Sequence, residues 1–264
     1  MSDAIRVGLV GFGYASKTFH APLIGGTPGM ALKAVASSDA DKVHADWPGV
    51  KVMSAPGDLL DDPDIDLVVI ATPNDTHFPL AKAALEAGKH VVVDKPFTVT
   101  LSQARELESL AKHCGRILSV FHNRRWDSDF LTVSALINEG QLGEVCYFES
   151  HFDRFRPQVR RRWREQAGPG SGIWYDLAPH LLDQVVVLFG LPVSITVDLA
   201  QLRPGAQSTD YFHAVLAYPQ RRVVLHGTLL AAAESARFIV HGSRASYIKS
   251  VSYTHLRAHE TSQD

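Results

Sequence analysis

Three side chains are placed where they could exchange a proton or stabilise a charge. Lys95 follows the apolar run "HVVVD" and precedes Pro96, so a rigid backbone would hold its ammonium group at a strand end. Asp176 and His180 are four residues apart in "GIWYDLAPHLLDQ", a spacing that places both on one face of a helix. A carboxylate beside an imidazole fixes its tautomer and raises its basicity. A solvated strand end and a surface ion pair are the alternative interpretations.

The stretch "VGLVGFGYASKTFH", residues 7–20, has the layout of a dinucleotide-binding loop. Gly11 would permit a tight turn after the first strand, and Gly13 would let the backbone approach a pyrophosphate at the positive end of a helix. Ser16 stands where the third glycine of G-x-G-x-x-G is expected. Serine is only slightly larger than the alanine that such loops accept, so we predict dinucleotide binding over an ordinary glycine turn. The expected contacts are Gly11, Phe12, Gly13, Tyr14 and Ala15.

The end of the second expected strand, "AVASSDADK", bears on the choice of cofactor. An NAD site usually has an acidic residue there, which binds the ribose 2′-hydroxyl. Ser37 takes that position, with Ser38 next, and neutral hydroxyls do not repel a 2′-phosphate. NADP is therefore the preferred cofactor. If the strand ends two residues later, Asp39 becomes the ribose acceptor and NAD is favoured.

Two further expected strands end in polar sequences, "ATPNDTH" at residues 71–77 and "DKPF" at residues 94–97. Open α/β sheets bind ligands at the carboxyl edge of their strands, so both stretches would border the cofactor. The expected contacts there are Thr72, Pro73, Asn74, His77, Asp94 and Lys95, with Asn74 and His77 near the nicotinamide end.

The first half alternates buried strands with helical patterns, which predicts right-handed βαβ crossovers and a doubly wound sheet. The strands are "IRVGLVG", "LKAVASS", "DLVVIATP", "HVVVDKP" and "RILSVFH". Their near-continuous apolar character fits a parallel sheet covered on both faces. A helix in "HFPLAKAALEAGK" should stop at Gly88, and another should start from a Thr100–Gln103 capping box and stop at Gly115.

Together these stretches resemble the Gfo/Idh/MocA family of nicotinamide-dependent oxidoreductases. The resemblance covers nearly the whole chain, from "RVGLVGFGYAS" to about "FIVHGSRASYIK". That family carries an E-K-P tripeptide at the fifth strand and a D-x-x-x-H motif in its second domain. They correspond here to Asp94-Lys95-Pro96 and Asp176-x-x-x-His180. The departures are Asp94 for glutamate and Ser16 for glycine or alanine.

The resemblance implies an α/β fold, in which residues 1–122 form a Rossmann domain with a doubly wound parallel sheet. Residues 123–250 would form part of a second, α+β domain for substrate binding and oligomerisation, with an open, mostly antiparallel sheet. Its strand-like runs are "VCYFESHFD", "VSITVDLAQ", "DYFHAVLAYP", "RRVVLHGTLL" and "RFIVHGS", and "YPQRR" indicates a hairpin turn. One face of such a sheet commonly packs against another subunit, so a homo-oligomer is expected for the full-length protein.

The resemblance also implies hydride transfer between NADP(H) or NAD(H) and a hydroxyl or carbonyl carbon of a sugar, inositol or similar polyol. His180 would act as general base, Asp176 would orient it, and Lys95 would stabilise charge on the same oxygen. Asn123, Arg124 and Trp163 are further candidates for substrate contacts. A non-catalytic NADP-binding sensor or regulatory protein is the alternative, and the intact Lys95, Asp176 and His180 argue against it.

Residues 153–165, "DRFRPQVRRRWRE", contain six arginines and two aromatic residues, a composition that could bind nucleic acid. The formal net charge of the chain is −2, which argues against that partner. We expect a loop near the active site whose arginines meet an anionic substrate or acidic neighbours, or are simply solvated. "GPGSG", residues 168–172, would link this loop to the helix of Asp176.

The bulk properties are those of an ordinary globular protein, with 264 residues, 45% of them hydrophobic and 20% charged. The two cysteines, Cys114 and Cys146, form no C-x-x-C pattern, so neither a disulfide framework nor a metal centre is predicted. The amino terminus lacks the layout of a signal peptide, and the longest apolar run is too short to span a bilayer. A reducing cytoplasm is the expected compartment.

The last residues, 251–264, do not follow the family pattern. Val251 to Thr261 look like a translated sequencing-adapter sequence, so we expect a non-native tail and a gene fragment that ends near Ser250. In that case the second domain would lack part of its sheet and its closing helix. A natural, divergent tail is the alternative.

Overall fold

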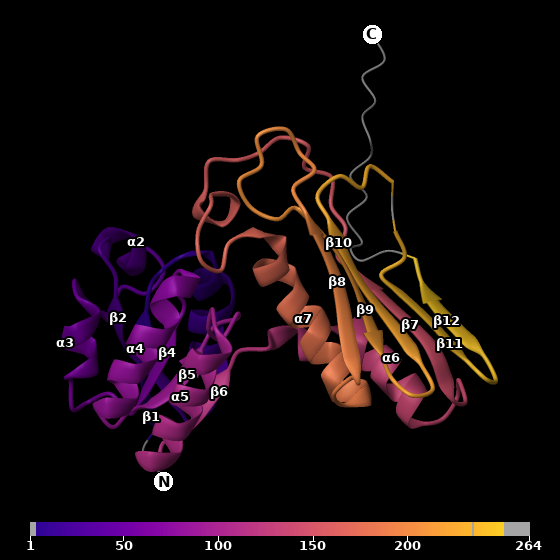
Figure 1. Ribbon diagram of the computed structural model, residues 1–264. Coiled ribbons are helices and arrows are strands. Elements are labelled where there is room, and N and C mark those ends of the chain that lie inside the picture. Colours follow the sequence, from indigo (N-terminus) through magenta and orange to yellow (C-terminus); the bar gives the residue numbers. More distant parts are fainter. Residues whose placement is uncertain (1–3, 234, 251–264) are drawn as a thin grey trace. The chain divides into compact units, whose positions relative to one another are not determined.

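The computed structural model describes residues 4–233 and 235–250, and the expected tail lies outside them. Contacts divide the chain into two compact units, Met1–His122 and Asn123–Asp264, shown in Figure 1. Among the described helices, none combines the length and the apolar character needed to cross a membrane.

The first unit is built on a six-stranded sheet in which every paired strand is parallel, with the order β3-β2-β1-β4-β5-β6. The strands are β1 (Ile5–Val10), β2 (Met30–Ala36), β3 (Lys51–Met53), β4 (Leu67–Ile70), β5 (His90–Val93) and β6 (Leu118–Val120). The helices are α1 (Ala21–Gly26), which continues a π-helical turn at Ser16–His20, α2 (Ala40–His44), α3 (Pro56–Leu60), α4 (Asn74–Glu86) and α5 (Leu101–His113). This strand order is that of a Rossmann fold, as predicted.

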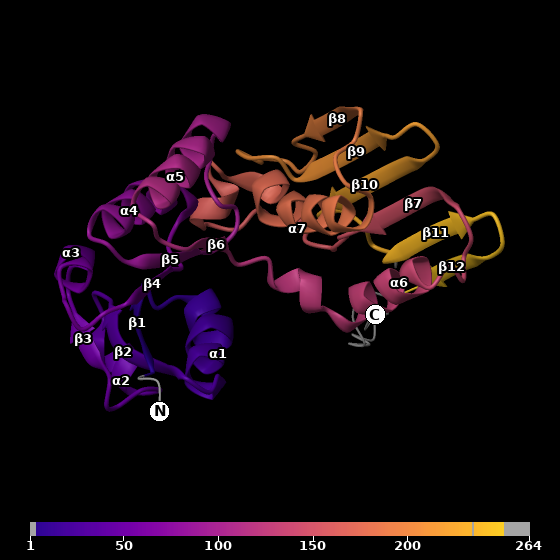
Figure 2. The ribbon, with the colours of Figure 1, turned by 90° about the horizontal axis from the view of Figure 1, so that it is seen from below.

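Two hydrophobic clusters cover the two faces of this sheet, which explains why its strands are apolar at nearly every position. One cluster joins the sheet to α3, α4 and α5, through residues such as Leu59, Ala84 and Leu107. The other joins it to α1 and α2, through Ile24 and Val43. Figure 2 shows α4 and α5 on one side of the strands and α1 on the other.

The helix start and stop signals predicted from the sequence are present in the structure. The Thr100 hydroxyl accepts from the Gln103 N–H while the Gln103 side chain accepts from the Thr100 N–H, so the capping box is formed. α4 ends just before Gly88, whose φ of +74° favours glycine. α4 begins at Asn74, three residues before the apolar pattern that predicted it, and the short strand β3 was not predicted.

The second unit contains a six-stranded sheet with the order β12-β11-β7-β10-β9-β8. Its strands are β7 (Val145–His151), β8 (Ser194–Ala200), β9 (Tyr211–Ala217), β10 (Arg222–Thr228), β11 (Phe238–Gly242) and β12 (Ser246–Lys249). β7 and β10 are parallel, and the other four pairs are antiparallel, which confirms the mostly antiparallel sheet. "YPQRR" forms the β9–β10 hairpin, while β12 was not predicted.

Helices α6 (Ser128–Asn138) and α7 (Gly172–Phe189) lie against one face of this sheet, as Figure 2 shows. Two short 3₁₀ helices, η2 (Asn123–Trp126) and η3 (Trp163–Glu165), precede them. Leu177, Leu181 and Val185 of α7 pack with alternate strand residues such as Phe148 and Leu225. Alternate residues of the strands and one face of α7 therefore pack together in one core.

Candidate functional site

The glycine-rich loop after β1 has a conformation that requires glycine at its first position. Gly11 has a φ of +89°, and a Cβ there would lie 2.7 Å from the Ala71 carbonyl oxygen. Its N–H donates to the Ala36 carbonyl oxygen at 2.9 Å, which ties the loop to the end of β2. A Cβ at Gly13 would meet no described atom within 4 Å, so the loop has open space on that side. Backbone that faces open space beside a helix start suits a phosphate-bearing ligand.

Ser16, which replaces the third glycine, is part of the loop's structure. Its side chain is fully buried, and its hydroxyl donates to the Gly11 carbonyl oxygen at 2.8 Å. The helical run that follows the loop spans residues 14–26 and contains Ser16 in its first turns. The serine therefore fits between helix and strand and adds a bond across the loop that glycine or alanine could not make.

The residues after β2 are those on which the choice between NADP and NAD was predicted to depend. β2 ends at Ala36, so Ser37 is the first residue beyond it. The Asp39 carboxylate accepts from the Lys42 N–H at 3.0 Å and thereby caps α2. The Asp39 N–H lies 3.2 Å from the Ser37 hydroxyl. The strand does not continue to Asp39, and that carboxylate already serves as a helix cap.

Asp94 braces the segment that carries Lys95. One carboxylate oxygen accepts from the Lys95 N–H at 2.7 Å, and the other lies 3.5 Å from His20 Nε2. Burial raises the pKa of Asp94, but the His20 imidazole and the Lys95 ammonium and N–H outweigh that effect and hold it below its usual range. The aspartate therefore stays ionised and supports the strand end, although the family pattern has a longer glutamate here.

His77, an expected cofactor contact, lies between two segments of backbone. Its side chain is fully buried, and its two ring nitrogens lie 2.8 Å from the Pro96 carbonyl oxygen and 3.0 Å from the Thr72 carbonyl oxygen. The ring thus links the segment after β4 to the segment after β5 and acts on their positions. Asn74 is also buried, at the first residue of α4, and the Lys95–Pro96 peptide is cis.

In the second unit, Asp176 and His180 lie on α7 with the predicted helical spacing. α7 begins after Ser171 and ends at Phe189, and the following Gly190 has a φ of +72°. His180 is 7% exposed, and its ring meets that of Phe152 edge-on at 6.3 Å. Asp176 Oδ1 lies 3.5 Å from Nε of Arg164, so the arginine-rich segment supplies a cation to it.

The residues expected to contact substrate lie on the short helices η2 and η3, and two of them contact other side chains of this unit. The Arg124 guanidinium donates to Asp127 at 2.9 Å, and the Arg124 carbonyl accepts from the Gln184 side chain at 2.8 Å. Asn123 begins η2. Trp163 begins η3, and the Arg164 guanidinium lies 4.4 Å above its ring.

A small pocket beside Asp176 is lined by residues of the arginine-rich segment and of the loop before β9. Its lining includes Arg162, Arg164, Asp176, Ser208 and Thr209. Its lining combines guanidinium, carboxylate and hydroxyl groups.

A buried ion network, which the sequence analysis missed, fixes one wall of this pocket. Arg203, 4% exposed, lies between Glu165 at 3.1 Å and Asp210 at 2.9 Å. The same guanidinium donates to the carbonyl oxygens of Arg156 and Gln158. The acidic neighbours expected for the arginine-rich segment are therefore Glu165 and Asp176, the first bound by Arg162 and the second by Arg164.

Two profiles of one oxidoreductase family match the chain. The NAD-binding Rossmann fold matches residues 5–122, and the C-terminal alpha/beta domain matches residues 134–264. The chain belongs to the Gfo/Idh/MocA family of oxidoreductases.

Relatives and solved structures agree with this assignment. The chain is 80% identical to the oxidoreductase YdgJ of Escherichia coli (strain K12), over 94% of this chain and 72% of the relative. It is 38% identical to the scyllo-inositol 2-dehydrogenase (NADP(+)) IolW of Bacillus subtilis (strain 168), over 94% of this chain and 69% of the relative. The solved structure of YPO2259 from Yersinia pestis has 70% identity and a TM-score of 0.90, over 95% of this chain and 71% of that one.

The carboxyl edge of the first sheet fits a nicotinamide dinucleotide. Gly11 and Gly13 follow β1, Ser37 follows β2, Thr72 follows β4 and Asp94 follows β5. In a sheet of this order, the crevice between the first and fourth strands is where dinucleotides bind. The open backbone at Gly13 and the tight turn at Gly11 are the features that such a ligand needs.

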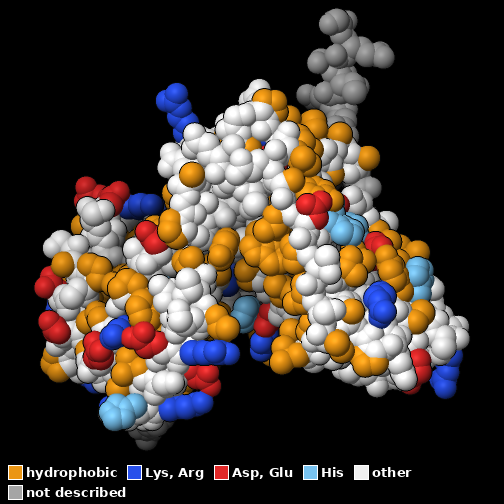
Figure 3. All heavy atoms as spheres, viewed as in Figure 1, with side chains coloured by type: hydrophobic (Ala, Val, Ile, Leu, Met, Phe, Trp, Pro, Cys, Tyr) orange, Lys and Arg blue, Asp and Glu red, His pale blue; other side chains and the backbone are white. Residues whose placement is uncertain are grey.

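On the face drawn in Figure 3, acidic and basic side chains are mixed over the first unit and form no single basic stripe.

Proposed function

We propose that this oxidoreductase transfers a hydride between NADP(H) and a hydroxyl or carbonyl carbon of a sugar, inositol or similar polyol. The observation that carries the proposal is the strand end of β5, where Asp94 binds the Lys95 N–H on the sheet edge that carries the glycine loop. Asp94 is held by His20, and the following Pro96 carbonyl is held by His77. The chain thus fixes the backbone on both sides of a lysine at the cofactor edge.

The bound nicotinamide would supply the redox chemistry, by accepting or donating a hydride. The Lys95 ammonium would donate a hydrogen bond to the substrate oxygen and stabilise its developing negative charge. His180 would accept the hydroxyl proton during oxidation and return it during reduction. Asp176 would favour the protonated imidazole through its charge. Asn123, Arg124 and Trp163 remain proposed substrate contacts.

The preference for NADP rests on the residues after β2. Ser37 presents a neutral hydroxyl at the position where an NAD enzyme places a carboxylate. One oxygen of the Asp39 carboxylate accepts from the Lys42 N–H at the N-cap of α2, so we assign Asp39 to the helix cap and Ser37 to the ribose. The name of the relative IolW specifies NADP(+), which supports the same choice.

The substrate class is supported by the names of two relatives. IolW is named for scyllo-inositol, and a relative from Ensifer adhaerens, 29% identical over 67% of this chain and 54% of its own length, is named a 1,5-anhydro-D-fructose reductase. Both names describe ring compounds with several hydroxyl groups. A polyhydroxylated ring is therefore the substrate class to test.

The test is a panel of inositols, sugars and anhydrosugars assayed with NADP and with NAD. Lys95→Ala and His180→Ala should each lower turnover by about a hundredfold or more, the scale of a positioned acid, base or charge. NADPH affinity should change little, because neither side chain is assigned to the phosphates or the ribose. Lys82→Ala is the matched control, since Lys82 pairs with Glu106 on the helices α4 and α5. Normal turnover in either site variant, or no turnover by the wild type on any substrate, would count against the proposal.

A further inference from the structure

The second sheet carries polar side chains on the face away from its helices. Phe148 of β7 and Phe152, which directly follows the strand, belong to the core with α7, so Glu149 and His151 point to the opposite face. In β10, Val223 and Leu225 belong to the same core, so His226 is on the opposite face as well. This face of the sheet is separate from the α7 side that bears His180.

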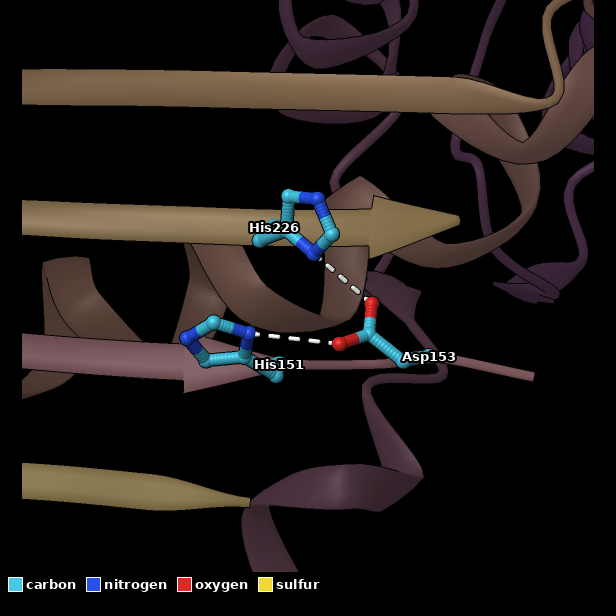
Figure 4. A group of neighbouring side chains, drawn as sticks. All are labelled: His151, Asp153 and His226. Carbon is cyan, nitrogen blue, oxygen red and sulfur yellow. Dashed lines mark hydrogen bonds and ion pairs between the residues drawn. The ribbon is translucent and has the colours of Figure 1, made fainter. Parts of the chain in front are cut away.

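Three residues on that face converge on one point. His226 and His151 are register partners in the parallel pair β10 and β7, and Asp153 follows β7 by two residues. Asp153 Oδ1 lies 2.7 Å from His226 Nδ1, and Asp153 Oδ2 lies 3.3 Å from His151 Nδ1. Figure 4 shows both rings turned toward the carboxylate between them.

This donor set is one that binds a transition-metal ion. We propose that His151, Asp153 and His226 form a binding site for a divalent first-row metal ion, Zn²⁺ foremost. Two imidazole nitrogens and a carboxylate oxygen suit zinc and its neighbours, whereas Mg²⁺ and Ca²⁺ prefer oxygen alone.

The distances between the ligand atoms are close to what such an ion needs. One atom from each residue can be chosen so that all three lie within 4.8 Å of one another. Bonds of about 2.0–2.1 Å in a tetrahedral site place ligand atoms roughly 3.3 Å apart. Small side-chain rotations would therefore bring the three atoms to one ion, with water in the remaining position.

A fourth residue, Glu149, contacts the nitrogen of His151 that faces away from Asp153. Glu149 Oε2 lies 2.9 Å from Nε2 of His151, on the far side of the ring from Asp153. A carboxylate that accepts the distal N–H of a histidine fixes the tautomer whose other nitrogen can bind a metal, an arrangement common around metal ligands. The Tyr147 hydroxyl in turn contacts Glu149.

Burial and charge favour a cation at this point. The side chains of His151, Asp153 and His226 are 19%, 8% and 18% exposed, so the cluster is largely shielded from water. The cluster and its neighbour Glu149 together contain two carboxylates, whose charge a bound cation would balance. An ion held by both strands would join β7 to β10, the parallel pair in the described sheet.

No metal centre was expected from the sequence, because the two cysteines lack the spacing of metal ligands. Asp153 and His226 are 73 residues apart in the sequence and meet only through the pairing of β7 with β10. "His-x-Asp" alone is too common a pattern to indicate a site.

The test uses the full chain, stripped of metal with a chelator and titrated with Zn²⁺ in competition with a chromophoric chelator. The wild type should bind one equivalent of Zn²⁺, and Asp153→Asn and His226→Gln should each weaken binding by at least about a hundredfold. Glu149→Gln should weaken it by about 10–100-fold, as expected for an outer-shell partner. His113→Gln is the control, because His113 is an exposed histidine at the end of α5 in the first unit. It should bind Zn²⁺ as the wild type does.

A measurement on the wild type tests the zinc ligands even if a variant fails to fold. X-ray absorption of the zinc-loaded protein should show two imidazole ligands and only nitrogen or oxygen donors. Absence of stoichiometric binding by the wild type, equal binding by the ligand variants, or sulfur from Cys146 in the zinc shell would each overturn the proposal.

Discussion

The buried hydroxyl of Ser16 donates a hydrogen bond to the carbonyl oxygen of Gly11, 2.8 Å away and five residues earlier in the chain. The third glycine of a dinucleotide-binding loop normally lets helix and strand pack closely. Here a slightly larger residue occupies the space and bonds to the glycine that makes the turn. The loop is therefore held by a side-chain bond at the position where related loops rely on small size alone.

Replacing Ser16 with alanine should loosen the loop. The variant keeps the Cβ and loses the bond, so it should cost about 1 kcal/mol of unfolding free energy and weaken NADPH binding a few-fold. Urea unfolding and fluorescence titration measure the two effects. Thr27→Val is the control, because the Thr27 hydroxyl also donates to a carbonyl, that of Leu23, but outside the loop. Wild-type NADPH affinity in Ser16→Ala would show that the bond does not organise the cofactor site.

The selectivity for NADP should depend on Ser37. In Ser37→Asp, a carboxylate at the end of β2 would repel the 2′-phosphate of NADPH and accept a bond from the ribose 2′-hydroxyl of NADH. The ratio of the NADPH and NADH affinities should change by at least about tenfold in favour of NADH, as fluorescence titration would show.

Asp39→Asn is the matched control for the cofactor prediction. Asparagine caps helices as well as aspartate does, so α2 should persist while the charge is lost. NADH affinity should stay unchanged. A marked loss of NADH binding in Asp39→Asn would assign the ribose to Asp39 and contradict the role given to Ser37.

Local signals in the sequence were sufficient for most of the first unit. Glycine at Gly11 and the Thr100–Gln103 capping box act through residues within a few positions of each other, so their consequences could be predicted. The strands β3 and β12 lie at the edges of their sheets and lack the apolar runs that predicted the equally short strands β4, β5 and β6. Both are defined by the strand beside them.

The partners of Arg203 and His77 could not be predicted from the sequence, because they depend on how separate segments of the chain meet. Arg203 is buried between Asp210, which lies in the same loop before β9, and Glu165 of η3. The sequence has no pattern that pairs these three residues. His77 has the spacing of a cofactor contact, yet its ring is held between two backbone carbonyls. In both cases the residue type was visible, but its partners depended on how the strand ends meet.

Asp94 should make the free energy of unfolding depend on pH in the acidic range. Because the folded protein holds the pKa of this carboxyl below its usual range, the ionised form contributes stability. The unfolded value is about 3.9, so that contribution is complete above it and is lost as the pH falls through the lower folded value. Asp94→Asn removes the charge and, with it, this part of the pH dependence.

Urea unfolding of wild type and Asp94→Asn between about pH 7 and about pH 3 would test this. The wild type should be the more stable at neutral pH, and its advantage should shrink as the pH falls below about 4, because the unfolded chain then binds a proton at Asp94 that the folded protein does not. Ser16→Ala is the control, since it removes no ionisable group and its effect on unfolding should not follow that curve. An advantage of the wild type that stayed constant down to about pH 3 would show that Asp94 is not held by His20 and Lys95 as the structure indicates.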